Sequence, residues 1–518
     1  MNEYVFDLGT RFRAVVASDP QACAIRSCEG GELAGFAELE DLSRRIACHL
    51  AANGIRKGDV VALLNDKSPL GYATMLGCLS IGAIYTNLDP DSPDERARRI
   101  LDRCEPVAIY NAFPVGAPPP LRANLAEICR ALVVDLRSDK VSAELELPVA
   151  ALPEVCLTGD SPAYIMFTSG STGYPKGAVI SHGNLLRFCD WAQAQFQITP
   201  SDRLTNVNPI YFDNSVFDFY ASLFNGASLV PFPADTVRDA RKLIASVDRA
   251  GCTIWFSVPS LLIYLLTTRA ISSGSFGSLR KIIFGGEGFP KPKLKQLYEL
   301  VGGRIDMENV YGPTETTCIC SCHTIRQDDF EDMASLATLG YLAPNFGYEI
   351  LSQDERPDFG ELLLTGPQVG LGYYGDPERS AAAFVQNPAN TRFRELGYRT
   401  GDLVERDRGG RLHFRGRVDF QIKHLGYRIE LEEIEAALNQ VEGVREAAAL
   451  YRRMGDGLGM IVAFAAVEDE LKGVAVVDAL RTLLPVYMVP SKVETRSHLP
   501  KNANGKIDRP ALQAELES

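Results

Sequence analysis

The chain has 518 residues, which is too long for one ordinary hydrophobic core, so two or more domains are expected. Hydrophobic residues make up 46% and charged residues 23%, an average pattern that argues against extended disorder. The formal net charge of -13 disfavours a general binder of nucleic acid or anionic membrane, because both kinds of binding need basic surface.

The N-terminus does not combine a basic run, an apolar core and a cleavage site of small residues. The chain also contains no stretch of about 18 uncharged apolar residues. These patterns predict a cytoplasmic protein that has neither nucleic acid nor a membrane as a partner.

The first predicted helix runs from Leu39 to Gly54, where apolar residues recur at helical spacing and the glycine is placed to end the helix. A strand is expected at Val60–Leu64, a second helix at Leu70–Gly82 and a further strand at Val107–Tyr110. This alternation predicts an α/β fold in which helices cover parallel sheets.

The α/β pattern continues to about residue 416, and a smaller unit follows it. In that unit we expect a helix that carries Leu431, Ile434 and Leu438 and another at Val474–Leu484. Strands are expected at Ala447–Leu450 and Ile461–Ala466.

Cysteine spacing gives little sign of a metal or redox site. The 12 cysteines are scattered, and no C-x-x-C pair occurs. Cys318, Cys320 and Cys322 are spaced to lie on one face of a strand. We favour buried reduced thiols, because metal ligands normally converge from separate turns.

Residues 164–177 read Y-I-M-F-T-S-G-S-T-G-Y-P-K-G, an apolar strand that enters a loop of hydroxyls and glycines ended by a lysine. Such a loop can direct backbone N–H groups, hydroxyls and a positive charge at one phosphate. It lacks the G-x-x-x-x-G-K-[ST] spacing of a Walker loop, and taken alone it could be a surface loop. The expected phosphate-binding residues are Thr168, Ser169, Gly170, Ser171, Thr172, Gly173 and Lys176.

The motif T-S-G-S-T-G-x-P-K-G resembles the signature of the adenylate-forming superfamily, which contains acyl- and aryl-CoA synthetases, luciferases and the adenylation domains of nonribosomal peptide synthetases. Further segments that resemble the family follow in the family's order. They are G-G-E at 285–287, Y-G-P-T-E at 311–315, Y-R-T-G-D at 398–402, G-R-V-D at 416–419 and N-G-K at 504–506.

The resemblance implies how ATP is bound. Tyr311 would stack on adenine with Gly286 on the other side, Asp402 would accept the ribose hydroxyls, and Arg417 would lie near the phosphate or ribose. The remaining residues of the expected ATP site are Glu287, Asn309 and Gly312.

The resemblance also implies three catalytic residues. Thr314 would contact the α-phosphate, and Glu315 would coordinate Mg²⁺, a hard cation that prefers carboxylate and phosphate oxygens. Lys506 would bring the substrate carboxylate and the α-phosphate together and stabilise the charge that develops.

Lys506 is expected in a small domain, apart from the phosphate loop, so the active site would be assembled by domain closure. We expect a large N-terminal domain of stacked β-sheets covered by helices at 1–418 and a small, mobile α+β domain at 419–518, with a hinge at Asp419. The resemblance implies a rotation that brings residues 421–430 to the acceptor thiol, with Lys423 and Gly426 on the thiol side.

The substrate acid is expected to be a neutral amino acid. In amino-acid-activating members of the family, an aspartate at the position of Asp213 pairs with the α-ammonium group, and a buried ammonium needs such a partner. Gly285 and Ser257 would leave space in the side-chain pocket. The other pocket residues carried over from the family are also uncharged, and they are Asn214, Phe217, Ile283, Val310, Cys318 and Ile319.

We expect a freestanding ligase that loads the phosphopantetheine thiol of a separate acyl or peptidyl carrier protein, because only 12 residues follow Lys506. The run G-Y-R-I-E-L-E-E-I-E at 426–435 resembles the D-alanine:carrier-protein ligase group, but that group often has cysteine where this chain has Gly285. Three alternatives remain open: a D-alanine ligase, a CoA ligase for a small carboxylic acid, and a catalytically silent homologue that binds a carrier.

Overall fold

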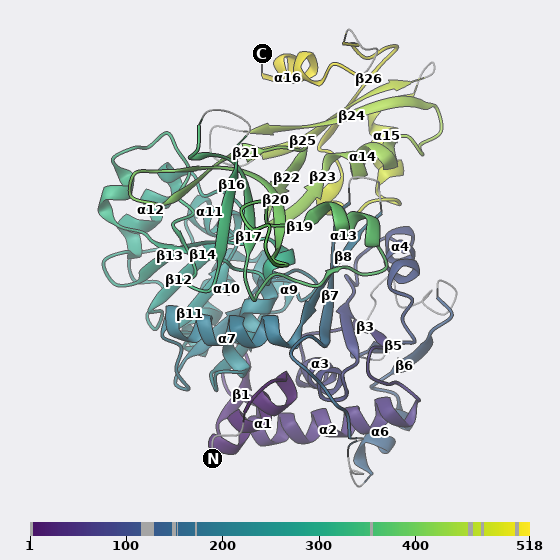
Figure 1. The fold of residues 1–518 in the computed structure, drawn as a ribbon, viewed down its shortest axis with the longest axis vertical. Coiled ribbons are helices and arrows are strands. Elements are labelled where there is room, and N and C mark those ends of the chain that lie inside the picture. Colours follow the sequence, from purple (N-terminus) through teal and green to yellow (C-terminus); the bar gives the residue numbers. More distant parts are fainter. Residues whose placement is uncertain are drawn as a thin grey trace.

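The computed structural model describes residues 4–114, 129–147, 152, 154–170, 174–352, 356–453, 459–467, 471–502 and 507–517. A large body holds the N-terminal part of the chain, and a smaller unit at one end of it carries the C-terminus (Figure 1). This is the mixed α/β architecture predicted from the sequence. None of the helices in these ranges is both long enough and apolar enough to cross a membrane.

Two large sheets form the body. The seven-stranded sheet has the order β18 (Gly372–Tyr373), β8 (Lys176–Ser181), β7 (Pro162–Thr168), β4 (Ile84–Asn87), β3 (Val60–Leu64), β5 (Ala108–Asn111) and β6 (Leu132–Asp135). The nine-stranded sheet has the order β15 (Tyr341–Leu342), β14 (Ser321–Thr324), β13 (Asp306–Tyr311), β12 (Lys281–Gly285), β11 (Ile254–Ser257), β9 (Arg203–Asn206), β10 (Ser228–Pro231), β1 (Cys23–Arg26) and β2 (Glu32–Gly35).

Most neighbouring strands in these sheets are parallel. The strands β3, β4, β5 and β6 pair in parallel, as do β9 to β13 where they are neighbours. The helices of the body are α1 (Leu8–Ser18), α2 (Phe36–Ala52), α3 (Pro69–Ile81), α4 (Asp94–Cys104), α6 (Asp139–Glu146), α7 (His182–Phe196), α8 (Asn214–Val216), α9 (Ala234–Arg238), α10 (Ala240–Ala250), α11 (Pro259–Thr267), α12 (Lys291–Val301) and α13 (Pro377–Ala383).

One hydrophobic core joins the two large sheets. It includes Val61 and Tyr164 of the seven-stranded sheet and Leu204 and Phe256 of the nine-stranded sheet, with α3 almost wholly buried among them. The Ser68 hydroxyl caps α3 at its start, and Gly82 ends it in the left-handed conformation, with φ of 73°. On the opposite faces, α4 covers the seven-stranded sheet, and α10, α11 and α12 cover the nine-stranded sheet.

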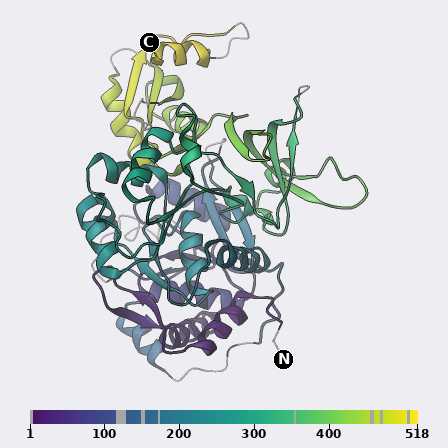
Figure 2. The same cartoon turned by 90° about the vertical axis from the view of Figure 1, so that its left-hand side faces the viewer.

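A smaller five-stranded sheet stands beside the body and is seen from the side in Figure 2. It contains β16 (Gly347–Leu351), β17 (Phe359–Thr365), β19 (Phe384–Gln386), β20 (Leu396–Arg406) and β21 (Leu412–Arg417). The chain leaves this sheet through β21 and enters the hairpin of β22 (Gln421–His424) and β23 (Tyr427–Glu430).

The C-terminal unit is built on a three-stranded sheet of β24 (Val444–Arg453), β25 (Gly459–Val467) and β26 (Lys492–Arg496). The helices α14 (Leu431–Leu438) and α15 (Gly473–Leu480) pack on one face, and α16 (Arg509–Glu517) packs on the other. The sequence predicted both strands and the α14 helix. The helix expected at Val474–Leu484 ends earlier, at Leu480, and the chain continues as a turn toward Pro485.

The cysteine prediction was wrong in its geometry. Strand β14 begins at Ser321, so of the three closely spaced cysteines only Cys322 lies in it. Cys318 has a φ of 71° and lies in the preceding turn, which follows the short helix η3 (Thr314–Thr316). Cys318 and Cys320 are buried in different hydrophobic clusters, so the period-two spacing does not form one face.

Candidate active site

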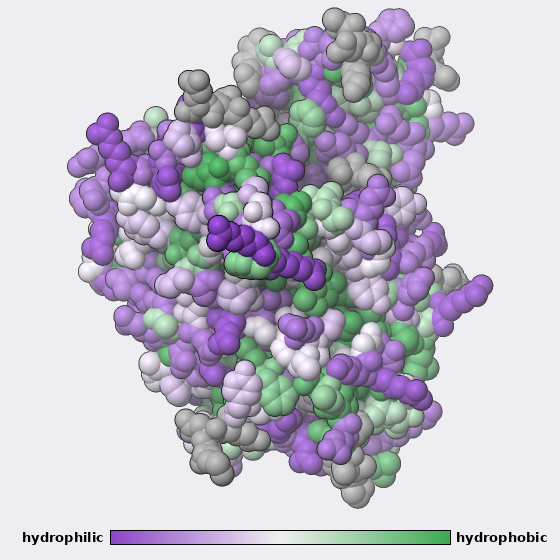
Figure 3. All heavy atoms as spheres, viewed as in Figure 1, coloured by the Kyte–Doolittle hydropathy of each residue, from purple (hydrophilic) through white to green (hydrophobic). Residues whose placement is uncertain are grey.

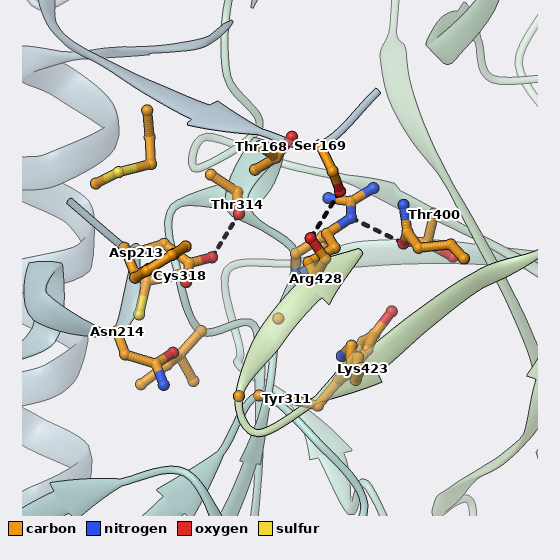
Figure 4. Close-up of a pocket in the computed structure, with 18 of the residues that line it drawn as sticks. Thr168, Ser169, Asp213, Asn214, Tyr311, Thr314, Cys318, Thr400, Lys423 and Arg428 are labelled. Carbon is orange, nitrogen blue, oxygen red and sulfur yellow. Dashed lines mark hydrogen bonds between the residues drawn. The ribbon is translucent and has the colours of Figure 1, made fainter. Parts of the chain in front are cut away.

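A small cavity of about 50 Å³ lies where the body meets the C-terminal unit. Its walls come from the ends of β7 and β13, from residues 212–214, from β20 and from the β22–β23 hairpin (Figure 4). Ligand pockets are usually several times larger. Lys423 and Arg428 extend from the hairpin and form part of the cavity wall (Figure 4).

The predicted adenosine-binding residues form one bonded network. The Tyr311 hydroxyl donates to Asp402 Oδ2 at 2.6 Å, and Arg417 pairs with Asp402 Oδ1. Arg417 also donates to both carboxylate oxygens of Asp419, at 2.6 and 2.7 Å. The predicted ribose acceptor and the predicted hinge residue are therefore joined through a single guanidinium group.

Glu315 is fully buried and paired. Tyr373 donates to Oε1 at 2.7 Å, and Arg428 Nη1 lies 2.6 Å from Oε2. Burial by itself would raise the pKa of Glu315, but the charges of Arg428 and Lys176 and the Tyr373 hydrogen bond outweigh it and lower the pKa to about 2. The carboxylate is therefore ionised and suited to a cation.

The described part of the phosphate loop contacts the C-terminal unit. The Ser169 hydroxyl donates to the Arg428 carbonyl at 2.6 Å and accepts from the Glu430 amide at 3.0 Å. Lys176 Nζ lies 2.8 Å from Glu430 Oε1. The Thr168 hydroxyl is buried and has no hydrogen-bond partner among the residues described, so a phosphate oxygen could satisfy it. Ser171, Thr172 and Gly173 lie outside the described residues.

The turn of the hairpin fits closely against the body. Gly426 has a φ of 81°, and a Cβ there would lie 2.5 Å from Val258 Cγ1, so no larger residue fits without rearrangement. The Gly426 amide donates to Glu287 Oε2 at 3.1 Å, and the Ser260 amide donates to Glu287 Oε1 at 2.6 Å. Glu287 therefore fixes the hairpin turn in this arrangement.

Lys423 places its ammonium nitrogen 5.4 Å from the centre of the Tyr311 ring. The resemblance to the family implies that this ring stacks on adenine. Burial lowers the pKa of Lys423, although Asp402 and Asp213 oppose that change. Gly286 lies on the cavity wall with a φ of 92°.

Asp213 precedes α8 and faces the same cavity. Thr314 donates a hydrogen bond of 2.5 Å to its Oδ2, and the two side chains point toward one another in Figure 4. Burial raises the pKa of Asp213, and the Thr314 hydrogen bond and the charges of Arg428 and Lys423 only partly offset that increase. A cationic ligand group would stabilise the ionised carboxylate.

The expected side-chain pocket is only partly assembled. Asn214, Val310, Cys318 and Ile319 line the cavity together with Asp213. The cavity-lining set does not include Phe217, Ser257, Ile283 or Gly285. Phe217, Ser257 and Ile283 are fully buried, and Phe217 packs against Phe256 with ring centres 5.0 Å apart.

The space expected at Gly285 and Ser257 is absent. A Cβ on Gly285 would lie 2.4 Å from the Val310 carbonyl oxygen, so the neighbouring strand β13 fills that position. The Ser257 hydroxyl accepts from Trp255 Nε1 at 2.8 Å and donates to the Val258 carbonyl at 3.1 Å. The small residues at these two positions therefore reflect close packing of the strands rather than an open pocket.

Comparison with known proteins places the chain in a family. Residues 12–374 match the family "AMP-binding enzyme", and residues 433–506 match "AMP-binding enzyme C-terminal domain". The chain belongs to the AMP-binding enzyme family. This confirms the resemblance drawn from the ordered motifs.

Two curated relatives of this AMP-binding enzyme align over nearly their whole length. A D-alanine--D-alanyl carrier protein ligase of Lacticaseibacillus paracasei is 32% identical over 494 residues, covering 93% of this chain and 94% of the relative. An L-proline--[L-prolyl-carrier protein] ligase of Streptomyces coelicolor is 32% identical over 500 residues, covering 92% and 91%. A solved structure of PA1221, an NRPS protein with adenylation and PCP domains, is 25% identical, with a TM-score of 0.83, covering 98% of this chain and 84% of that one.

The predicted lysine of this AMP-binding enzyme, Lys506, lies outside the described residues. Its described neighbour Ile507 pairs with Lys501 and packs with Leu512 on the α16 face of the three-stranded sheet. Among the described residues, the hairpin lines the cavity, whereas Lys501 and Ile507 do not.

Several cavity-lining residues of the enzyme were not among the predicted site residues. They are Arg96, Met166, Phe167, Phe212, Phe256, Pro313, Thr400, Gln421, Arg428 and Tyr487. Arg428 lies inside the segment 421–430 that the resemblance assigned to thiol transfer, so the sequence could have indicated it as a site residue. Arg96 is one arginine of a charged helix, and nothing in its local sequence distinguishes it.

Proposed function

We propose that this AMP-binding enzyme uses ATP to convert a neutral amino acid into an aminoacyl adenylate and then transfers the aminoacyl group to the phosphopantetheine thiol of a separate carrier protein. The observation that carries the proposal is the Asp213 carboxylate, which faces the cavity and bonds Thr314 of the predicted nucleotide motif. A carboxylate in this position suits the α-ammonium group of an amino acid. The names of the two curated relatives support the same class of reaction.

In the first half-reaction, the substrate carboxylate attacks the α-phosphorus of ATP and pyrophosphate leaves. Tyr311 and Asp402 would hold the adenosine, and Thr314 would contact the α-phosphate. The ionised Glu315 carboxylate fits a magnesium ion, which would neutralise phosphate charge. Lys506 would draw the two anions together.

In the second half-reaction, the thiol attacks the aminoacyl carbonyl and AMP leaves. The β22–β23 hairpin lies against the cavity, and the close approach of Gly426 to Val258 supports its assignment to the thiol side. The residues that hold the hairpin, Glu315 and Lys176, are also those proposed to meet ATP and its metal. We therefore assign the two half-reactions to different positions of a small domain, 419–518, that turns on Asp419 relative to the body, 1–418.

The side chain of the amino acid is proposed to be neutral and small. Val310, Cys318 and Ile319 form an uncharged wall, and Val310 fills the position beside Gly285. The D-alanine and L-proline ligases match equally well at 32% identity, so their similarity favours neither substrate over the other. The cytoplasmic setting expected from the sequence is part of this proposal.

Pyrophosphate exchange tests the proposal. Radiolabelled pyrophosphate should enter ATP only when a suitable amino acid is present, across a panel of L-, D- and nonproteinogenic amino acids and their deaminated analogues. Exchange supported only by acids without an α-amino group would contradict the amino acid assignment. Thioester formation with coenzyme A as efficient as with a phosphopantetheinylated carrier would favour a CoA ligase, and no exchange with any acid would favour a silent homologue.

A further inference from the structure

Two carboxylates of the C-terminal unit lie at the phosphate loop of the body. Glu433 Oε2 accepts a hydrogen bond of 3.3 Å from the Gly170 amide, and Glu430 Oε1 lies 2.8 Å from Lys176 Nζ. A backbone amide and a lysine are the donors that such a loop offers to a phosphate. In this arrangement the loop binds anions that belong to its own chain.

Glu433 is held in place by an arginine of the body. Arg96 of α4 pairs with Glu433 Oε1, and the two side chains are 9% and 4% exposed. The pair therefore joins α4 to α14 across the boundary between the two units. A buried ion pair is costly to break from one side, because the remaining charge stays buried without a partner.

The Gly170 amide cannot donate its hydrogen bond to Glu433 and to a phosphate at the same time. A pyrophosphate group at the loop would place several negative charges beside the Glu433 and Glu430 carboxylates, and like charges in a buried site repel strongly. Binding of pyrophosphate and docking of α14 are therefore alternatives. Departure of pyrophosphate frees Gly170 and Lys176 for the two carboxylates.

We propose that Glu433 is a positioning residue for thiol transfer: its carboxylate, oriented by Arg96, replaces pyrophosphate at the Gly170 amide and thereby docks the hairpin that receives the thiol. This inference rests on the proposed function. It adds a residue that acts after adenylation and competes directly with the product of the first half-reaction.

The test compares Glu433→Gln with Glu435→Gln. Glu435 lies on the same helix, pairs with Arg509 and accepts from the Ala449 amide, all within the C-terminal unit, so it is a matched control. Three quantities are measured for each protein: amino-acid-dependent pyrophosphate exchange, single-turnover transfer from preformed enzyme-bound adenylate to a phosphopantetheinylated carrier, and magnesium pyrophosphate binding by calorimetry.

Glu433→Gln should slow transfer by about tenfold or more, the effect of one lost charged hydrogen bond, and should bind pyrophosphate several-fold more tightly. Exchange should be retained. Glu435→Gln should change neither transfer nor pyrophosphate affinity beyond the effect of any lower melting temperature. Weaker pyrophosphate binding by Glu433→Gln, or equal loss of exchange and transfer, would overturn the inference.

Swapping the charges of Arg96 and Glu433 distinguishes the hydrogen bond at the Gly170 amide from the packing of the buried ion pair. The double variant Arg96→Glu with Glu433→Arg can restore a buried pair, but it places a cation at the Gly170 amide. Its melting temperature should recover relative to Glu433→Arg alone, while transfer stays slow. Recovered transfer would mean that only the ion pair matters and would overturn the role of the carboxylate. If the unaltered protein showed no amino-acid-dependent exchange, the proposed function itself would fail.

Discussion

Arg428 and Glu315 form a buried ion pair across the two units of the molecule, with Nη1 of the arginine 2.6 Å from Oε2 of the glutamate. Arg428 also donates to Gln421 at 2.8 Å within the hairpin. The carboxylate proposed to hold the magnesium ion of ATP is therefore used here to dock the hairpin. The Glu315 carboxylate cannot bind the magnesium ion and hold Arg428 in this way at the same time.

Arg428→Ala should separate the two half-reactions. The hairpin loses its ion pair with Glu315, so transfer to the carrier should fall by about tenfold or more, while pyrophosphate exchange is retained. Rapid-quench transfer and exchange assays on the same protein measure both. Arg415→Ala is the control, because Arg415 forms an exposed pair with Glu405 and lies away from the cavity. Equal loss of both activities would contradict the assignment of the hairpin to transfer.

Lys506→Ala should have the opposite effect. The lysine is proposed to act only while carboxylate and α-phosphate react, so exchange should fall by orders of magnitude. Transfer from an adenylate supplied to the enzyme should be nearly unchanged. Lys501→Ala, at a nearby exposed lysine, is the control. If transfer from the supplied adenylate fell as much as exchange, the assignment of the lysine to adenylation and of the hairpin to transfer would be contradicted.

The ion pair between Glu315 and Arg428 should also contribute to the pH dependence of the free energy of unfolding. Its pKa of about 2 lies below the ordinary value of 4.5, because Arg428, Lys176 and Tyr373 outweigh the effect of burial. The pair therefore stabilises the fold fully above pH 4.5, and its contribution of about 3 kcal/mol is lost as the pH falls towards 2. Stability measured by urea unfolding should decline less steeply between these values in Glu315→Gln than in the parent.

The control for this experiment is Glu405→Gln. Glu405 pairs with Arg415 at the surface, where an ion pair contributes little to the free energy of unfolding. Its pH dependence should match that of the parent protein. A Glu315→Gln curve parallel to the parent curve would mean that folding does not lower the pKa of this carboxylate.

Much of the fold follows from local patterns. Strand Val60–Leu64 is a continuous apolar run, and α3 is bounded by Ser68 and Gly82, so both could be read from short segments. The turn at Cys318 could not, because its positive φ is imposed by the chain that leads from η3 into β14. Alternation in sequence predicts a strand only where a neighbouring strand is there to pair with it.

The site was predictable as a set of motifs but not as an arrangement. The order of the motifs indicated Tyr311, Thr314 and Asp402, which line one cavity, and Glu315, which pairs with Arg428 of the cavity wall. The contact of Glu433 with Gly170 depends on how the C-terminal unit sits against the body. No local sequence encodes that placement, because it results from the packing of surfaces far apart in the chain.

Asp213→Asn should weaken recognition of the amino group specifically. The variant keeps the shape of the side chain and its hydrogen-bonding capacity toward Thr314 but removes the negative charge. The KM for the amino acid in pyrophosphate exchange should rise by about tenfold to a hundredfold, the effect of one charged hydrogen bond, while the KM for ATP changes little. Asp190→Asn, at an exposed aspartate that pairs with Arg11, should leave both values unchanged.

The deaminated analogue of the same acid makes this test specific to the charge. In the parent protein, the amino acid should support exchange far better than the analogue, because the analogue leaves the Asp213 carboxylate buried without a cation. In Asp213→Asn that preference should largely disappear, since the substrate ammonium then has no counter-charge. An undiminished preference for the amino acid would show that another group binds the ammonium, and the substrate assignment would then lose its main support.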